Sequence, residues 1–130
     1  MGFTDYIKKQ EYPFGVIYYY DNYVIADLNE DAKVNTMVSK QILKDLHEFY
    51  KSTKVVYISN RQFLYDIDPS VYKLVNPKKL IGIAIVGNGP ELRQRASSEQ
   101  VLYEGSFSFF DNMDSAISWA KSFVRSASKS

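Results

Sequence analysis

The chain has 130 residues, with 16 Lys and Arg against 15 Asp and Glu, and contains no cysteine. At roughly 100–200 residues per domain, this length predicts one domain. The lack of cysteine excludes a disulfide scaffold, a thiolate metal site and a cysteine nucleophile, and the balanced charge gives no reason to expect a nucleic-acid partner.

The first predicted elements form an antiparallel pair of strands. Residues 14–20 and 23–28 are rich in β-branched and aromatic side chains. Asp21 and Asn22 separate them, and because both residue types tolerate a positive φ, they predict a tight hairpin turn.

A long amphipathic helix is predicted next. Residues 32–50 carry apolar side chains at helical spacing, and Asn29 or Asp31 is the expected N-cap. Residues 54–59 then form a short, densely apolar run, which is typical of a strand covered on both faces.

Two further helices begin at prolines. Asp68 before Pro69 predicts the start of a short helix, because the carboxylate accepts a free N–H and proline lacks the N–H that would be left unpaired. Residues 80–86 are the most apolar strand, and Pro90 then starts a helix that runs to about residue 102.

The last predicted elements are a strand at 106–110 and a helix capped by Asp111 or Asn112. After the opening hairpin, strands and helices alternate, which predicts a single α/β domain with a mostly parallel sheet covered by helices. We assign residues 13–126 to this domain. Residues 1–12 are interpreted as an N-terminal extension, and residues 127–130 as a C-terminal tail.

Five segments, GVIYYYDNYVIADLNE, KVVYISNR, DPSVYK, LIGIAIVGNG and FSFFDNMDSAISWAKSFV, cover nearly the whole chain. In this order they resemble the STAS fold of the bacterial anti-sigma-factor antagonists, and more closely the SpoIIAA-like group. That fold is shared in outline with the lipid-binding CRAL-TRIO domains. The segments are strand and helix-start patterns without a catalytic signature, so the resemblance specifies fold better than function.

The resemblance implies a phosphorylation switch. In the antagonists, a Ser or Thr at the start of the helix after the third strand is phosphorylated by a partner kinase, which blocks binding. Ser70 is the nearest positional match in this sequence, and Ser59 at the strand end is a weaker one. The usual pattern places the residue soon after the strand and follows it with Ser-Gly. Here eight residues, 60–67, intervene and no glycine follows.

Ligands of open parallel sheets bind beyond the carboxyl ends of the strands. Arg61 can bind a carboxylate or phosphate there, although pairing with Asp66 or Asp68 is the commoner arrangement, since structural ion pairs outnumber anion sites. The backbone N–H groups of residues 87–89 can cradle an anion, although a plain turn explains them too. The candidate binding residues are therefore Asn60, Arg61, Phe63, Leu64, Tyr65, Gly87, Asn88 and Gly89.

Aromatic residues make up 15% of the chain, including 11 Tyr. Tyr18 and Tyr20 share one face of the predicted hairpin and Tyr19 the other, so the tyrosines either pack a core edge or form an interface, including one between two copies of the chain. Apolar side chains in the loop at 63–65 indicate a lid over a pocket or a docking surface.

No catalytic arrangement is visible, since His47 is the sole histidine and sits on a predicted helix without further ligands or a nearby nucleophile. We therefore expect a non-enzymatic, cytoplasmic binding module in bacterial signalling, without metal, cofactor or stable membrane insertion. The expected partner is a kinase, another regulator or a second copy. The alternative is a domain that binds a small apolar or lipid-like ligand.

Overall fold

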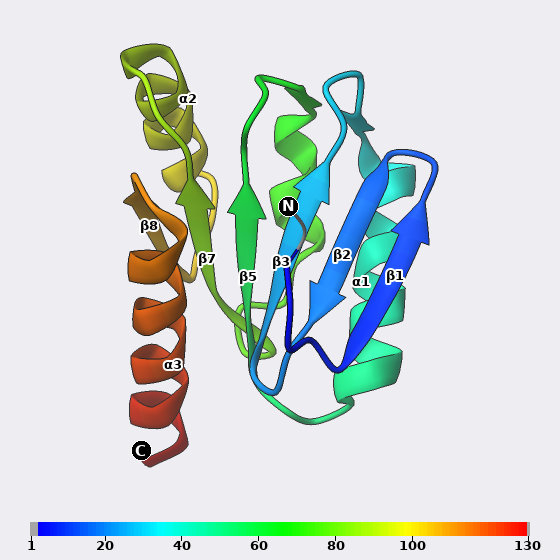
Figure 1. The fold of residues 1–130 in the computed structure, drawn as a ribbon, viewed down its shortest axis with the longest axis vertical. Helices are drawn as coiled ribbons and strands as arrows, with labels where there is room; N and C mark the ends of the chain where they lie inside the picture. The colour runs from blue at the N-terminus through cyan, green and yellow to red at the C-terminus, as the bar shows by residue number, and fades with distance from the viewer. Residues whose placement is uncertain (1–2, 130) are drawn as a thin grey trace.

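The computed structural model describes residues 3–129, and its centre is a six-stranded sheet in the order β1-β2-β3-β5-β7-β8 (Figure 1). The first three strands are antiparallel, whereas β3, β5, β7 and β8 run parallel. This confirms the predicted α/β fold with a mostly parallel sheet. The strands are β1 (Lys8–Tyr12), β2 (Gly15–Tyr19), β3 (Tyr23–Leu28), β5 (Val55–Asn60), β7 (Leu80–Val86) and β8 (Ser106–Phe110).

One face of the sheet, at the back in Figure 1, is covered by α1 (Thr36–Tyr50), the 3-10 helix η1 (Pro69–Leu74) and α2 (Pro90–Gln100). Apolar side chains of these helices and of alternate strand residues form one core there. A second, two-stranded ladder joins β4 (Lys33–Val34) to β6 (Asp66–Ile67). It ties the segment before α1 to the segment before η1.

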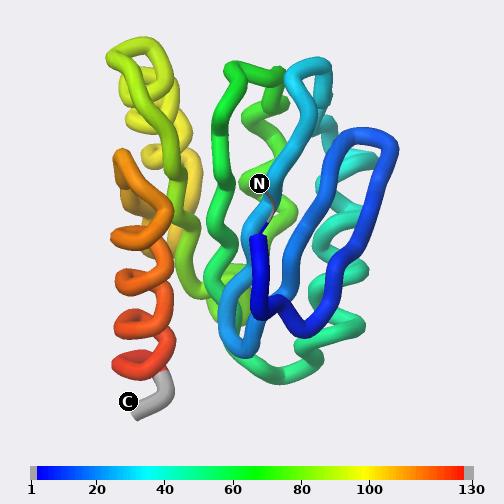
Figure 2. Tube along the Cα trace, in the orientation of Figure 1, coloured from blue at the N-terminus to red at the C-terminus, as the bar shows by residue number. Residues whose placement is uncertain are grey.

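The other face is covered by α3 (Met113–Lys129) and by residues 3–7, which cross in front of the strands (Figure 2). Alternate side chains of the central strands, among them Ile25, Val56 and Ile58, pack here against Ala116 and Ala120 of α3. The strands are therefore buried on both faces, which explains why 54–59 and 80–86 are almost continuously apolar.

The structure corrects the expected N-terminal extension and C-terminal tail. Residues 8–12 form β1, an edge strand paired along its length with β2, so the domain begins before residue 13. Exposed and half-buried residues alternate along β1, because one side of this edge strand faces solvent. At the other end α3 continues through Lys129, so the expected tail is helical as far as it is described; residues 1–2 and 130 lie outside the described part.

Helix α1 begins later than predicted. Its N-cap is Asn35, whose side chain accepts a hydrogen bond from the Val38 N–H at 2.9 Å, and not Asn29 or Asp31. The reason is the β4–β6 ladder, which holds residues 33–34 in extended conformation. The final helix is capped by Asn112, whose side chain accepts from the Ser115 N–H at 2.8 Å.

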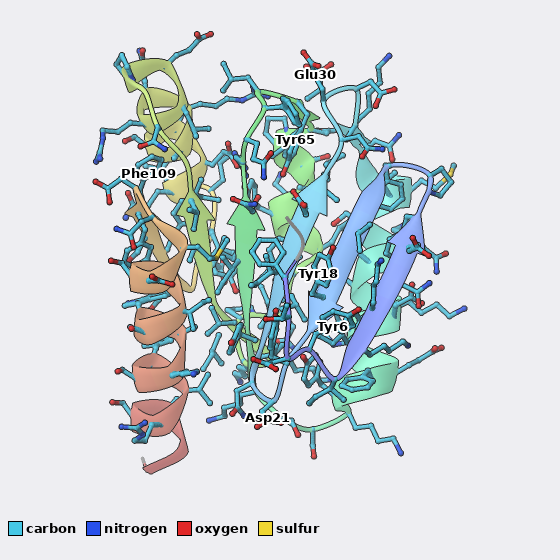
Figure 3. All side chains as sticks on the ribbon, in the orientation of Figure 1. Tyr6, Tyr18, Asp21, Glu30, Tyr65 and Phe109 are labelled. Carbon is cyan, nitrogen blue, oxygen red and sulfur yellow. The ribbon has the colours of Figure 1, made fainter. Side chains whose placement is uncertain are left out.

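The hairpin turn is tight, with the Tyr20 N–H donating to the Tyr23 carbonyl at 2.9 Å. Neither Asp21 nor Asn22 has a positive φ, so the predicted reason for the turn is wrong. Tyr19 packs into the core beneath α1, while Tyr18 packs on the opposite face beside Tyr6 (Figure 3). Tyr18, Tyr19 and Tyr23 are buried within this chain, so packing in the core accounts for them.

Candidate functional site

The carboxyl ends of β3, β5 and β7 lie together at one edge of the sheet, at the top of Figure 1. Glu30 and Tyr65 mark this edge in Figure 3. The candidate residues of the sequence follow β5 and β7 directly, so the topology brings them to the same edge. Among them Phe63, Leu64, Asn88 and Gly89 are exposed, Asn60 and Gly87 are half-buried, and Arg61 and Tyr65 are buried.

Strand β5 and the residue that follows it direct three polar side chains toward the layer of α1 and η1. Tyr57, Ser59 and Arg61 occupy alternate positions and therefore share one face. All three border the same internal space. The mainly apolar strand thus delivers two hydroxyls to this layer, and the residue after it delivers a guanidinium.

Arg61 forms a bidentate ion pair with Glu99 of α2. Its Nη1 and Nη2 atoms each donate to a carboxylate oxygen at 2.6 Å, and its Nε donates to Ser59 Oγ at 3.0 Å. Arg61 is 5% exposed and Glu99 is 7% exposed. Burial opposes the charge on the guanidinium, but the hydrogen bonds to Glu99 outweigh it and raise the pKa of Arg61.

Two tyrosines complete this polar network. The Tyr72 hydroxyl of η1 donates to Glu99 Oε1, and the Tyr65 hydroxyl shares a hydrogen bond with Ser59 Oγ at 3.0 Å. Burial and then the Glu99 carboxylate raise the pKa of Tyr72 above its ordinary value. We call Ser59, Arg61, Tyr65, Tyr72 and Glu99 the buried polar network.

The Arg61 guanidinium, which the sequence offered for binding an anion, is instead part of the buried polar network. Arg61 does grip a carboxylate in bidentate fashion, but the carboxylate belongs to Glu99 and not to a ligand, and its partner is neither Asp66 nor Asp68. Gly87 is required by packing, since a Cβ there would lie 2.1 Å from Leu92 Cδ2 and 2.9 Å from the Arg61 carbonyl. Close packing therefore explains the glycine at this position without a bound anion.

The loop at residues 61–65 is held from several sides. The Arg61 N–H donates to the Val86 carbonyl at 2.8 Å, and Arg95 Nη2 donates to the Tyr65 carbonyl at 2.6 Å. Between these anchors, Phe63 and Leu64 remain 40% and 42% exposed. We call this segment the anchored loop; it presents two apolar side chains to solvent on a fixed backbone.

A partly open cavity of about 70 Å³ lies beside the network, between the sheet and the layer of α1 and η1. Most of its lining is aliphatic, contributed by residues such as Leu28, Ile42, Val71 and Ile85. Arg61, Tyr65 and Tyr72 close one part of it. Of the three residues expected to cover a pocket, Tyr65 lines this cavity, whereas Phe63 and Leu64 do not.

The two candidate phosphorylation sites differ in accessibility. Ser59 is 2% exposed and bonded within the buried polar network, so a kinase cannot reach it in this fold. Ser70 is exposed at the start of η1, and its N–H and hydroxyl both donate to Asp68 Oδ1, at 3.0 and 2.9 Å. These bonds lower the pKa of the Asp68 carboxyl, and they confirm Asp68 as the predicted helix cap.

His47 is half-buried on α1 and is not part of this edge. Burial, and then the positive charge of Lys79, lower its pKa. Within residues 3–129, no three His, Asp or Glu side chains are grouped closely enough to hold a metal ion. In the same described range, no helix combines the length and apolar character needed to cross a bilayer.

No protein-family model matches the sequence, and no curated protein matches it. The structure is similar to that of an uncharacterized DUF3478-family protein from Shewanella loihica PV-4, which has a SpoIIAA-like fold. The TM-score is 0.54, and the match covers 92% of this chain and 98% of that chain. The chain has a SpoIIAA-like fold. At 16% sequence identity the likeness shows the fold alone.

Sequence reasoning missed two polar members of this edge of the SpoIIAA-like fold, Glu99 and Tyr72. A signal for Glu99 was present, because Leu92, Ala96 and Glu99 share the inward stripe of α2. A carboxylate on such a stripe needs a buried partner, and Arg61 is the cation that follows a buried strand. For Tyr72 the sequence shows an aromatic residue on a short helix, with nothing that points to a carboxylate.

Proposed function

We propose that this chain is a non-enzymatic protein-binding module that docks its partner on the anchored loop. The observation that carries the proposal is the exposure of Phe63 and Leu64 between two fixed points of the backbone. Exposed apolar side chains on a loop are typical of docking surfaces. Because the loop is already ordered, binding does not have to order it, which favours affinity.

The chemistry of the edge supports binding over catalysis. Arg61, Glu99 and Tyr72 satisfy one another's charges and hydrogen bonds, so none of them is free to transfer a proton or attack a substrate. Their role is to hold the base of the loop. The resemblance to anti-sigma-factor antagonists suggests the kind of partner, a kinase or another regulator in bacterial cytoplasmic signalling.

Ser70 is the position we propose for regulation by phosphorylation. It is exposed and lies a few residues beyond the anchored loop along the chain. A phosphate on Ser70 Oγ would remove the hydroxyl donor from Asp68 and place negative charge beside that carboxylate. The start of η1 would be weakened. Phosphorylation would therefore alter the structure close to the docking surface.

Affinity capture from the source cells tests the docking surface, with mapping of phosphorylated residues in the same samples. The variant Phe63→Ser/Leu64→Ser removes both apolar side chains, and Val101→Ser/Leu102→Ser removes a second exposed apolar pair, in the turn after α2. We expect one partner to bind the unmodified chain and the control variant, and to bind the loop variant at least tenfold more weakly once purified.

Equal binding by all three proteins would refute the anchored loop as the docking point. Recovery of only the chain itself would refute a heterologous partner. Phosphate on residues other than Ser70, with Ser70 unmodified, would refute the regulatory part alone.

A second candidate function, binding of a small apolar ligand, is favoured by the partly open cavity. Its volume of about 70 Å³ is too small for a lipid chain. A cavity of about 150 Å³ accommodates benzene. If this function holds, the ligand is a small molecule, so the lipid-like form of the alternative does not fit.

A further inference from the structure

The lining of the partly open cavity is apolar but not uniformly so. The cavity is lined by aliphatic side chains from β3, α1, η1 and β7, and by the hydroxyl-bearing residues Ser39 of α1 and Tyr57 of β5. Ser39 is 8% exposed, and Tyr57 is half-buried where it borders the cavity. Burial raises the pKa of the Tyr57 hydroxyl, so it remains a protonated hydrogen-bond donor.

These two hydroxyls lack protein partners. In the described part of the chain, neither Ser39 Oγ nor the Tyr57 hydroxyl makes a hydrogen bond, whereas Ser59, Tyr65 and Tyr72 around the same cavity are all bonded. Both oxygens also retain accessible surface, unlike the Tyr19 hydroxyl, which has neither partner nor accessible surface. Because neither hydroxyl is used by the protein, both are available to hydrogen-bond a molecule that enters the cavity.

The charge around the cavity restricts that occupant to a neutral molecule. Arg61 is the charged residue among the lining side chains, and its guanidinium is committed to Glu99 and Ser59. An anion or cation would therefore enter without a free counter-charge, which is costly in an apolar interior.

We propose that the cavity binds a small neutral molecule with an apolar body and one hydroxyl or carbonyl end group. The end group accepts a hydrogen bond from Tyr57, and a ligand hydroxyl also donates to Ser39 Oγ. The volume is roughly half that of a benzene-binding cavity, so the ligand is smaller than benzene. This inference rests on the second candidate function and adds the polar recognition to it.

NMR titration with n-propanol and with xenon tests the proposal. Methyl resonances of Val71, Ile83 and Ile85 report on the cavity, which they line. We expect saturable n-propanol shifts in these methyl groups, and affinity at least fivefold lower in Tyr57→Phe/Ser39→Ala, with xenon binding retained. Amide proton–nitrogen spectra establish that each variant is folded, and Ser39→Leu, which fills the cavity, should bind neither probe.

Each outcome is decisive. Saturable n-propanol binding that is unchanged in the double variant would overturn the polar recognition and leave the apolar cavity intact. Shifts that spread over the whole molecule without saturation, together with no xenon binding, would overturn the ligand-binding function as well. The variant Phe63→Ser/Leu64→Ser should keep n-propanol binding, since neither side chain lines the cavity.

Discussion

The ion pair of Arg61 and Glu99 is the most consequential pairwise contact at the carboxyl-end edge. Both side chains are almost fully removed from water, and each provides the other's counter-charge. A charge left alone in such a place costs far more than an exposed one, because the interior screens it poorly. The pair therefore fixes how α2 sits against the end of β5.

Removal of either partner should destabilise the fold strongly. We expect Arg61→Met and Glu99→Gln each to lower the free energy of unfolding by about 3–5 kcal/mol, because each leaves an uncompensated buried charge. The double variant should lose less than the sum of the two by about 2 kcal/mol or more. Urea denaturation of the three variants measures this coupling. Strictly additive losses would mean that the two charges do not stabilise each other.

At the scale of the element, the β4–β6 ladder determines where α1 begins. It keeps residues 33–34 extended and leaves Asn35 as the first residue able to cap the helix. The helix then starts with a side-chain hydrogen bond to Val38 and presents Ile42 and Leu46 to the core.

Substitution of the cap tests this start. We expect Asn35→Ala to lower the free energy of unfolding by about 0.5–2 kcal/mol, the usual effect of losing an N-cap side chain. Asp31→Ala serves as the control, since Asp31 is exposed and makes no side-chain hydrogen bond; its effect should stay within about 0.5 kcal/mol. Thermal or urea unfolding gives both values, and the reverse order would restore Asp31 as the cap.

The elements that the sequence predicts well are those whose signals are local. The apolar strand at 80–86 and the Asp68-Pro69 helix start have the expected bounds, because burial and capping leave their marks within a few residues. The edge strand β1 has no local signal of this kind, since its sequence, KKQEY, is neither apolar nor β-branched. It becomes a strand only because β2 lies beside it. The same holds for the candidate site, since Arg61 and Glu99 are 38 residues apart in sequence.

At the scale of the whole molecule, the sheet separates two cores, and tyrosines contribute to both. Many of these hydroxyls sit in surroundings that disfavour a negative charge. Burial is the main cause, and it raises the pKa of Tyr19, Tyr20 and Tyr103 to about 12, from an ordinary value of 10.0. The high aromatic content therefore gives the fold a shared dependence on pH.

The direction of that dependence follows from proton linkage. Below about pH 10 the phenols are protonated in both states, so their contribution to stability is complete. As the pH rises from about 10 to about 12, the unfolded chain releases phenol protons that the folded chain retains, so stability is progressively lost. Each fully buried tyrosine with this shift should cost about 1.4 kcal/mol of stability by about pH 11.

Urea denaturation at about pH 9 and about pH 11 measures this loss, which we expect to reach about 2 kcal/mol or more because Tyr19 and Tyr103 both contribute. The variant Tyr103→Phe cannot titrate at that position, so its loss should be smaller by about 1 kcal/mol. Its lower starting stability, from the missing hydrogen bond to the Leu80 carbonyl, does not affect the comparison, because only the change with pH is read. An unfolding free energy that stays constant over this range would show that the tyrosine hydroxyls are far more accessible to solvent than their packing indicates.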